Sequence, residues 1–116
     1  MSLAKKLNLK EAMSIRVVGK PANLSLDDVT MTPKKDGAVL VFAKTAQELE
    51  DHAAPVVEAA KADRLAWVAY PKAGQLGTDL NRDRLWKQLE KHGIQPVRQV
   101  AIDDVWSALR FRCPHA

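Results

Sequence analysis

The chain has little of what would tie it to an oxidising compartment, a membrane or a metal. Its only cysteine, Cys113, can form no internal disulfide and has no cysteine partner for a metal site. No apolar run approaches the roughly 20 residues that span a bilayer. The first twelve residues, MSLAKKLNLKEA, lack the apolar core and the cleavage site of a signal peptide. We therefore expect one domain over 1–116, in the cytoplasm, with no membrane role.

Charge of one sign is also not concentrated. The formal net charge is +4, but acidic and basic residues are mixed, and the densest basic cluster is Lys34-Lys35. Aromatic residues make up only 5% of the chain and are not interleaved with basic ones as stacking platforms for bases would be. This pattern argues against nucleic acid as the partner and favours a solvated surface.

Motifs of catalysis and cofactor binding are missing. The chain has neither the G-x-G-x-x-G fingerprint nor the G-x-x-x-x-G-K-[ST] phosphate loop. Its histidines, His52, His92 and His115, do not have the spacing of metal ligands. Asp103 and Asp104 are adjacent, so on an extended chain they would point to opposite faces, and a turn explains them better than an acid–base pair. We expect no catalytic residue, no metal and no cofactor.

What the chain does have is an alternation of strand and helix patterns. Residues 14–19 (SIRVVG) are short and β-branched, and residues 38–43 (AVLVFA) and 65–70 (LAWVAY) are continuous apolar runs. Runs without polar alternation are typical of parallel strands that are covered on both faces.

Between the two apolar runs, Thr45 and Glu48 match a capping box. An apolar stripe then recurs at helical spacing, formed by Leu49, Ala53, Val56 and Ala60. Pro55 interrupts this pattern, so we expect a kink or a break there.

The second predicted helix lies within residues 80–94. Asn81 is a plausible N-cap, and Gly93 stands where a left-handed C-cap belongs. The predicted inward face consists of Leu85, Trp86 and Leu89.

The last predicted elements are two strands within residues 96–112, joined by a tight turn. The fold class is therefore α/β: a single three-layer, Rossmann-like domain with three parallel strands, a C-terminal antiparallel hairpin and helices on both faces.

The succession of parallel strand, helix, parallel strand, helix and antiparallel hairpin resembles the second half of a class I methyltransferase fold. This resemblance, together with the apolar content of ALRF, which suits an interior strand, implies the strand order 1-2-3-5-4. More closely, the chain resembles a family of small bacterial proteins known as domain of unknown function 3052. The matching stretches are KKLNLK, WVAYPK, TDLNRDRLW and VAIDDVWSALRF. The chain departs from the family around its first strand, where it has Glu11-Ala12 and Gly19-Lys20-Pro21, and its segment 22–37 is short. The resemblance implies a fold but no activity.

In an open parallel sheet, ligands bind beyond the carboxyl ends of the strands. Each predicted parallel strand is followed there by a lysine, and two helix N-termini, which favour anions, face the same edge. We therefore predict an anion site at this edge. Its candidate residues are Lys20, Lys44, Tyr70, Lys72, Gly74 and Gly77. The alternative is that these lysines are ordinary loop residues and that YPKAGQLGTDL only connects a strand to a helix.

A second candidate surface is the hairpin, where Asp103, Trp106 and Arg110 could meet a protein partner. Their alternative role is packing within the hairpin. Together these features predict a non-catalytic binding or interaction domain for a small anionic ligand or a protein. The alternative function is a minimal methyltransferase-like enzyme, although GKPAN, after the first strand, lacks the glycine-rich cofactor turn.

Overall fold

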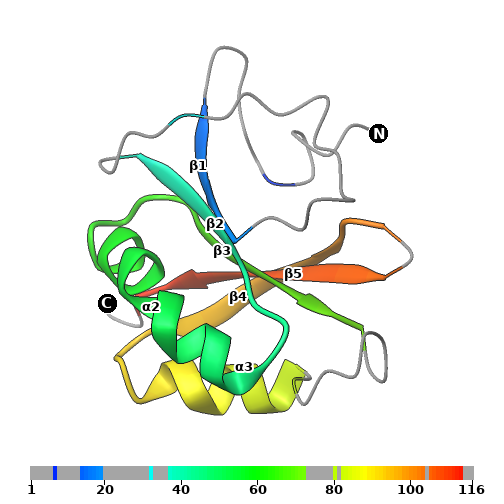
Figure 1. Ribbon diagram of the computed structural model, residues 1–116. Coiled ribbons are helices and arrows are strands. Elements are labelled where there is room, and N and C mark those ends of the chain that lie inside the picture. Colours follow the sequence, from blue (N-terminus) through cyan, green and yellow to red (C-terminus); the bar gives the residue numbers. More distant parts are fainter. Residues whose placement is uncertain are drawn as a thin grey trace.

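The computed structural model describes residues 7, 14–19, 32, 37–72, 80, 82–103 and 105–113. Within them, five strands form one sheet in the order β1-β2-β3-β5-β4 (Figure 1). This is the strand order predicted from the sequence. The strands are β1 (Ile15–Val18), β2 (Ala38–Phe42), β3 (Ala66–Pro71), β4 (Gln95–Ala101) and β5 (Trp106–Arg112).

The sheet is mixed, and its mixture differs from the expected one. β1, β2 and β3 are parallel, β5 is antiparallel to β3, and β4 is antiparallel to β5. Four strands therefore share a direction and β5 alone opposes them. The expected arrangement of three parallel strands plus a C-terminal antiparallel hairpin is therefore met only in part, because the sheet is a single mixed one. The two strands of the hairpin belong to the same sheet, and one of them points with the parallel strands.

The first described helix, α2 (Ala46–Lys61), begins as its capping pattern predicts. Thr45 is extended and its hydroxyl accepts a hydrogen bond from the Glu48 N–H, with a distance of 3.1 Å between nitrogen and oxygen. The apolar stripe from Leu49 to Ala60 is buried. The helix continues past Pro55, so the chain does not break into two pieces there.

The second described helix, α3 (Arg82–Glu90), ends as predicted. Gly93 has a φ of +83°, in the left-handed region, and its N–H donates to the Glu90 carbonyl. Ile94 and Leu89 are buried in the same cluster.

Trp86 does not belong to the inward face of α3 as predicted, because 41% of its surface is exposed. At 100° per residue, Trp86 and Gln88 lie roughly 80° to either side of the direction set by Leu85 and Leu89. The Gln88 flank is held against α2, since its side-chain amide donates to the Ala46 carbonyl. The opposite flank, with Trp86, is left to solvent.

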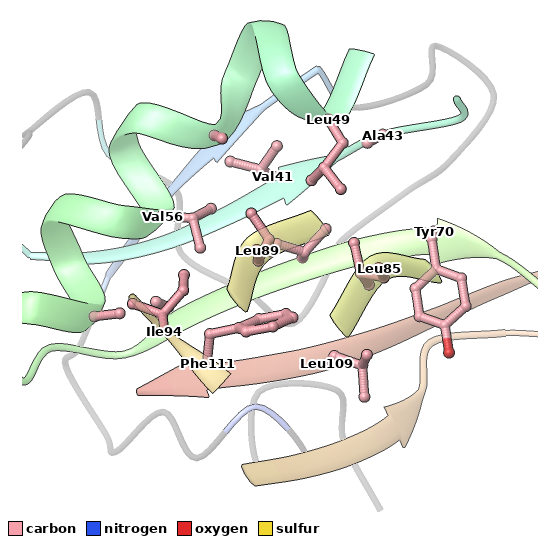
Figure 2. Close-up of a cluster of buried hydrophobic side chains, with 14 of the residues drawn as sticks. Val41, Ala43, Leu49, Val56, Tyr70, Leu85, Leu89, Ile94, Leu109 and Phe111 are labelled. Carbon is pink, nitrogen blue, oxygen red and sulfur yellow. The ribbon is translucent and has the colours of Figure 1, made fainter. Parts of the chain in front are cut away.

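Both described helices pack on one face of the sheet. Figure 2 shows Leu49 and Val56 of α2 and Leu85 and Leu89 of α3 directed towards side chains of the strands, including Val41 and Phe111. The prediction of helices on both faces is thus not met by the described helices. The reason is topological: successive right-handed crossovers that advance in one direction along a sheet keep their helices on one side.

The other face of the sheet, which we call the second face, has its own buried cluster. Its members come from the strands and from Leu7, whose carbonyl accepts a hydrogen bond from the Trp67 indole at 3.0 Å. The cluster consists of Leu7, Ile15, Ala38, Leu40, Phe42, Trp67, Ala69, Trp106 and Ala108. Neither described helix has the length and apolar content that crossing a bilayer requires.

Candidate functional site

The predicted anion edge can be followed only in part. Lys20, Gly74 and Gly77 lie outside the described residues. Lys44 and Lys72 do follow neighbouring parallel strands, as predicted, since Phe42 of β2 pairs with Ala69 of β3. Continuing the alternation of each strand would send Lys44 to the face of Phe42 and Lys72 to the face of Tyr70, which are opposite faces. Convergence of the lysines therefore stays a prediction.

Tyr70 is buried, which limits what it could contribute to that edge. Only 4% of its surface is exposed, and its ring belongs to the cluster under the helices (Figure 2). Its hydroxyl accepts a hydrogen bond of 3.3 Å from the side-chain amide of Gln99 on β4. The Tyr70 side chain therefore links β3 to β4, and little of its surface is left to contact a ligand.

A groove of about 370 Å³ runs between the N-terminal half of α2 and α3. Basic side chains dominate its lining, with Arg84, Lys87 and Lys91 on one side and Glu50 on the other. Glu50 Oε2 lies 3.3 Å from His92 Nε2. Because the groove begins where α2 begins, it lies near the edge at which the sequence predicts an anion. Sequence reasoning did not find it, since it depends on how the two helices pack.

The three candidate residues of the hairpin, Asp103, Trp106 and Arg110, have different environments in the structure. One carboxylate oxygen of Asp103 accepts hydrogen bonds from the N–H groups of Val105 and Trp106, both at 2.8 Å. This closes the turn, in line with the turn interpretation of that stretch. Trp106 is only 5% exposed and packs edge-on against Phe42, with 5.2 Å between ring centroids. Trp106 is thus part of the packing, whereas Asp103 is exposed at the turn, and a partner at this surface stays a prediction. Asp104 lies outside the described residues.

Arg110 has a different environment. Its Nε is buried and has no hydrogen-bond partner in the structure, although the residue as a whole is partly exposed. It lies on the second face, directly opposite Arg98 of β4 and two residues from Arg112 on its own strand. Burial, followed by the charge of Arg112, lowers the pKa of Arg110; Asp63 acts against this and Arg98 adds to it. We call Arg98, Arg110 and Arg112 the arginine cluster.

The arginine cluster is costly for the fold. Like charges directly opposite one another in a sheet are destabilising, and an unpaired buried polar group loses its hydration without compensation. Among the described residues, the carboxylate paired with the cluster is Asp63, which bonds Arg112 at 2.7 Å, and both side chains are well exposed. Such a pair contributes little. The Arg98 side chain makes no hydrogen bond or ion pair within the described chain, so the guanidinium groups of Arg98 and Arg110 are the two that an anion would meet.

Of this cluster, only Arg110 was a candidate from the sequence. Counted from the turn, strand alternation leads without a shift from the pairing of Ala101 with Ser107 to the pairing of Arg98 with Arg110. The register shifts only beyond this pair, between Pro96 and Arg98, and the bulge there leaves Gln95 opposite Arg112. The signal in the sequence is the equal spacing of Arg98 and Arg110 on either side of the turn.

Comparison of the chain with protein-family models, with curated proteins and with solved structures finds no match in any of the three. The resemblance to domain of unknown function 3052 therefore stays a prediction.

Proposed function

We propose that this α/β protein is a non-catalytic binding domain that takes an anionic group at the arginine cluster. The observation that carries the proposal is the pairing of Arg98 with Arg110 across β4 and β5, with the Arg110 Nε buried and unpartnered. Guanidinium groups match carboxylates and phosphates through two parallel hydrogen bonds. An anion between the two side chains would relieve their repulsion and satisfy the buried donor.

Packed side chains lie beside the cluster on the same face of the sheet. Trp67 of β3 is the cross-strand neighbour of Arg110 and is fully buried, and Leu40 of β2 is the neighbour of Trp67. An apolar, packed neighbour lowers the local dielectric and strengthens a charge-assisted hydrogen bond. It also limits the rotamers of Arg110, so less side-chain entropy is lost on binding.

The test is a thermal-shift titration with inorganic phosphate and with succinate, against sodium chloride at the same ionic strength. A ligand at 100 times its dissociation constant stabilises the fold by about 2.7 kcal/mol. We expect a saturable rise in melting temperature for the parent protein and none for Arg98→Gln. Phosphate also stabilises proteins through exclusion from the surface, so the difference between parent and variant is the meaningful quantity.

The matched control is Arg16→Gln. Arg16 is a partly exposed arginine on β1, at the opposite edge of the sheet, and its loss changes the net charge equally. The control should respond to phosphate as the parent does. An equal response from parent, Arg98→Gln and Arg16→Gln would show that the arginine cluster binds no anion.

A second location for an anion is the predicted edge beyond β2 and β3. The groove between α2 and α3 favours this location, because it lies near that edge and its lining is mostly basic. The variant that separates the two locations is Lys87→Gln with Lys91→Gln. Loss of the phosphate response in this variant, with a normal response in Arg98→Gln, would move the proposed site to the groove. The double variant Lys44→Gln with Lys72→Gln tests, in the same assay, the anion site that the sequence predicts beyond the ends of β2 and β3.

The strand order also bears on the family. A lone antiparallel strand inserted next to the edge of the sheet supports the Rossmann-like likeness to the second half of a class I methyltransferase. This likeness brings no activity with it, because unrelated functions share such folds.

A further inference from the structure

We propose that the anionic group at the arginine cluster is carried by an extended acidic segment of a partner protein, which adds to β4 as a further strand of the sheet. This inference rests on the proposed function and specifies its ligand. It begins from a row of side chains on the second face, Leu40–Trp67–Arg110–Arg98, which crosses four neighbouring strands. The row ends at β4 with two adjacent cations.

The next position in that row belongs to a strand that would be added beyond β4. Directly opposite residues of antiparallel strands have Cβ atoms about 4.5–5.5 Å apart, so an aspartate or glutamate there would reach the Arg98 guanidinium. An acidic residue two positions away on the added strand would lie on the same face. The charge of the arginine cluster is therefore complementary to a strand with alternate carboxylates.

The edge strand β4 is open to such an addition. It is the last strand of the sheet (Figure 1), and most of its residues are exposed, with 48% of Val97 accessible. Ile102 donates its N–H to the Trp106 carbonyl, towards β5. By alternation, the backbone N–H and C=O of Gln99 point away from the sheet, where an added strand would bond them.

Pro96 and the bulge beside it protect only the first part of the edge, as such features do in natural sheets. Among the described residues of β4, neither a proline nor a bulge follows at Arg98 and Gln99. A second copy of this chain fits this part poorly, because pairing β4 with itself in antiparallel fashion brings two arginine clusters together. The occupant is therefore an acidic strand from another protein.

The experiment uses fluorescence anisotropy with the full chain and labelled peptides. The first peptide alternates glutamate and valine, the second has glutamine in place of glutamate, and the third keeps every glutamate but has proline in place of valine. We expect the first to bind at least about tenfold more tightly than either of the others, because only it combines charge with strand formation.

Two variants locate the binding. Arg98→Glu should weaken the first peptide by at least about tenfold, whereas Arg16→Glu, on β1, should leave it unchanged. Gln99→Pro removes an outward N–H and the side-chain hydrogen bond to Tyr70, but no backbone hydrogen bond of the β4–β5 ladder. It should therefore weaken the peptide while the thermal response to phosphate persists. Should Gln99→Pro fail to fold, slowed exchange of the Gln99 amide in the parent on peptide addition supplies the same information.

Equal binding of the first and third peptides, with a phosphate response that requires Arg98, would overturn the added strand and leave the anion site intact. Peptide binding that is unaffected by Arg98→Glu would also overturn it. Self-association of the parent in sedimentation, abolished by Gln99→Pro, would assign the edge to a second copy and overturn it as well. Absence of both the peptide and the phosphate response would remove the proposed function along with the inference.

Discussion

Arg110 shows how a single residue can oppose the stability of the fold that holds it. Its backbone lies on β5, between β3 and β4, and its Nε is buried without a hydrogen-bond partner. A methionine of similar length would fill the same space without the desolvation of a charge. Residues that cost stability where an apolar one would fit are often retained for function.

The first prediction follows from this conflict. Arg110→Met should raise the free energy of unfolding by about 1 kcal/mol, because it removes a buried, unpartnered Nε–H and the repulsion between Arg110 and Arg98. The same variant should lose the thermal response to phosphate. Urea denaturation measures the first effect and thermal shift the second. A variant that is destabilised by more than about 1 kcal/mol would mean that Arg110 serves packing.

At the scale of elements, α3 depends on a few contacts because only nine residues form it. Leu85 and Leu89 bury it against the sheet, and Gly93 ends it. Such a short helix is marginal on its own, so its packing carries most of its stability.

The second prediction therefore concerns Leu89. Leu89→Ala should lower the free energy of unfolding by about 2–5 kcal/mol, since Leu89 is fully buried and also shares a cluster with Ile94 beyond the helix end. Lys87→Ala, on the exposed side of the same helix, is the matched control and should change little. Similar midpoints in urea for Leu89→Ala and the parent would contradict the packing described for α3.

The third prediction concerns the turn after α3. Gly93→Val should destabilise by roughly 1–2 kcal/mol, because a β-branched residue resists a positive φ. Space is not the reason, since an added Cβ would meet only Lys61 Cε at an ordinary 3.7 Å. Gly93→Asn, which tolerates the left-handed region, should cost less. Equal thermal melting of the two variants would show that the backbone there adapts.

At the scale of the whole molecule, local signals in the sequence were enough to predict several features. Patterns among neighbouring residues predicted the cap at Thr45, the glycine after α3 and the apolar runs of β2 and β3. Each of these features depends on a residue and the few that flank it. The strand order was predicted from the methyltransferase-like resemblance together with the apolar content of ALRF, which suits a strand with neighbours on both sides.

What the sequence could not show depends on contacts between distant segments. The exposure of Trp86 results from the way Gln88 ties α3 to α2, and no periodicity encodes that choice. The arginine cluster depends on which residues of β4 and β5 stand opposite each other, since Arg98 pairs with Arg110. Alternation within one strand assigns a residue to a face but names no partner on the next strand, and the bulge at Val97 shifts the partners of Gln95 and Pro96.

The interior position of β5 leads to the last prediction, which concerns how stability is distributed over the sheet. Although β5 is the last described strand of the chain, it has a hydrogen-bonded neighbour on each side and its residues from Trp106 to Leu109 are buried. Interior strands usually open only with global unfolding, whereas edge strands exchange through smaller openings. Native-state hydrogen exchange should therefore show β3 and β5 as the slowest strands and β4 as a faster one, despite its position before β5 in the chain. Binding of an acidic strand should slow exchange in β4 selectively, because only its outer backbone groups gain partners. If β5 instead exchanged as fast as β4 in the free protein, the hairpin would be opening as a unit from β3. Arg110 would then separate from Trp67 in these openings, and the arginine cluster would lack the rigid arrangement that the proposed binding needs.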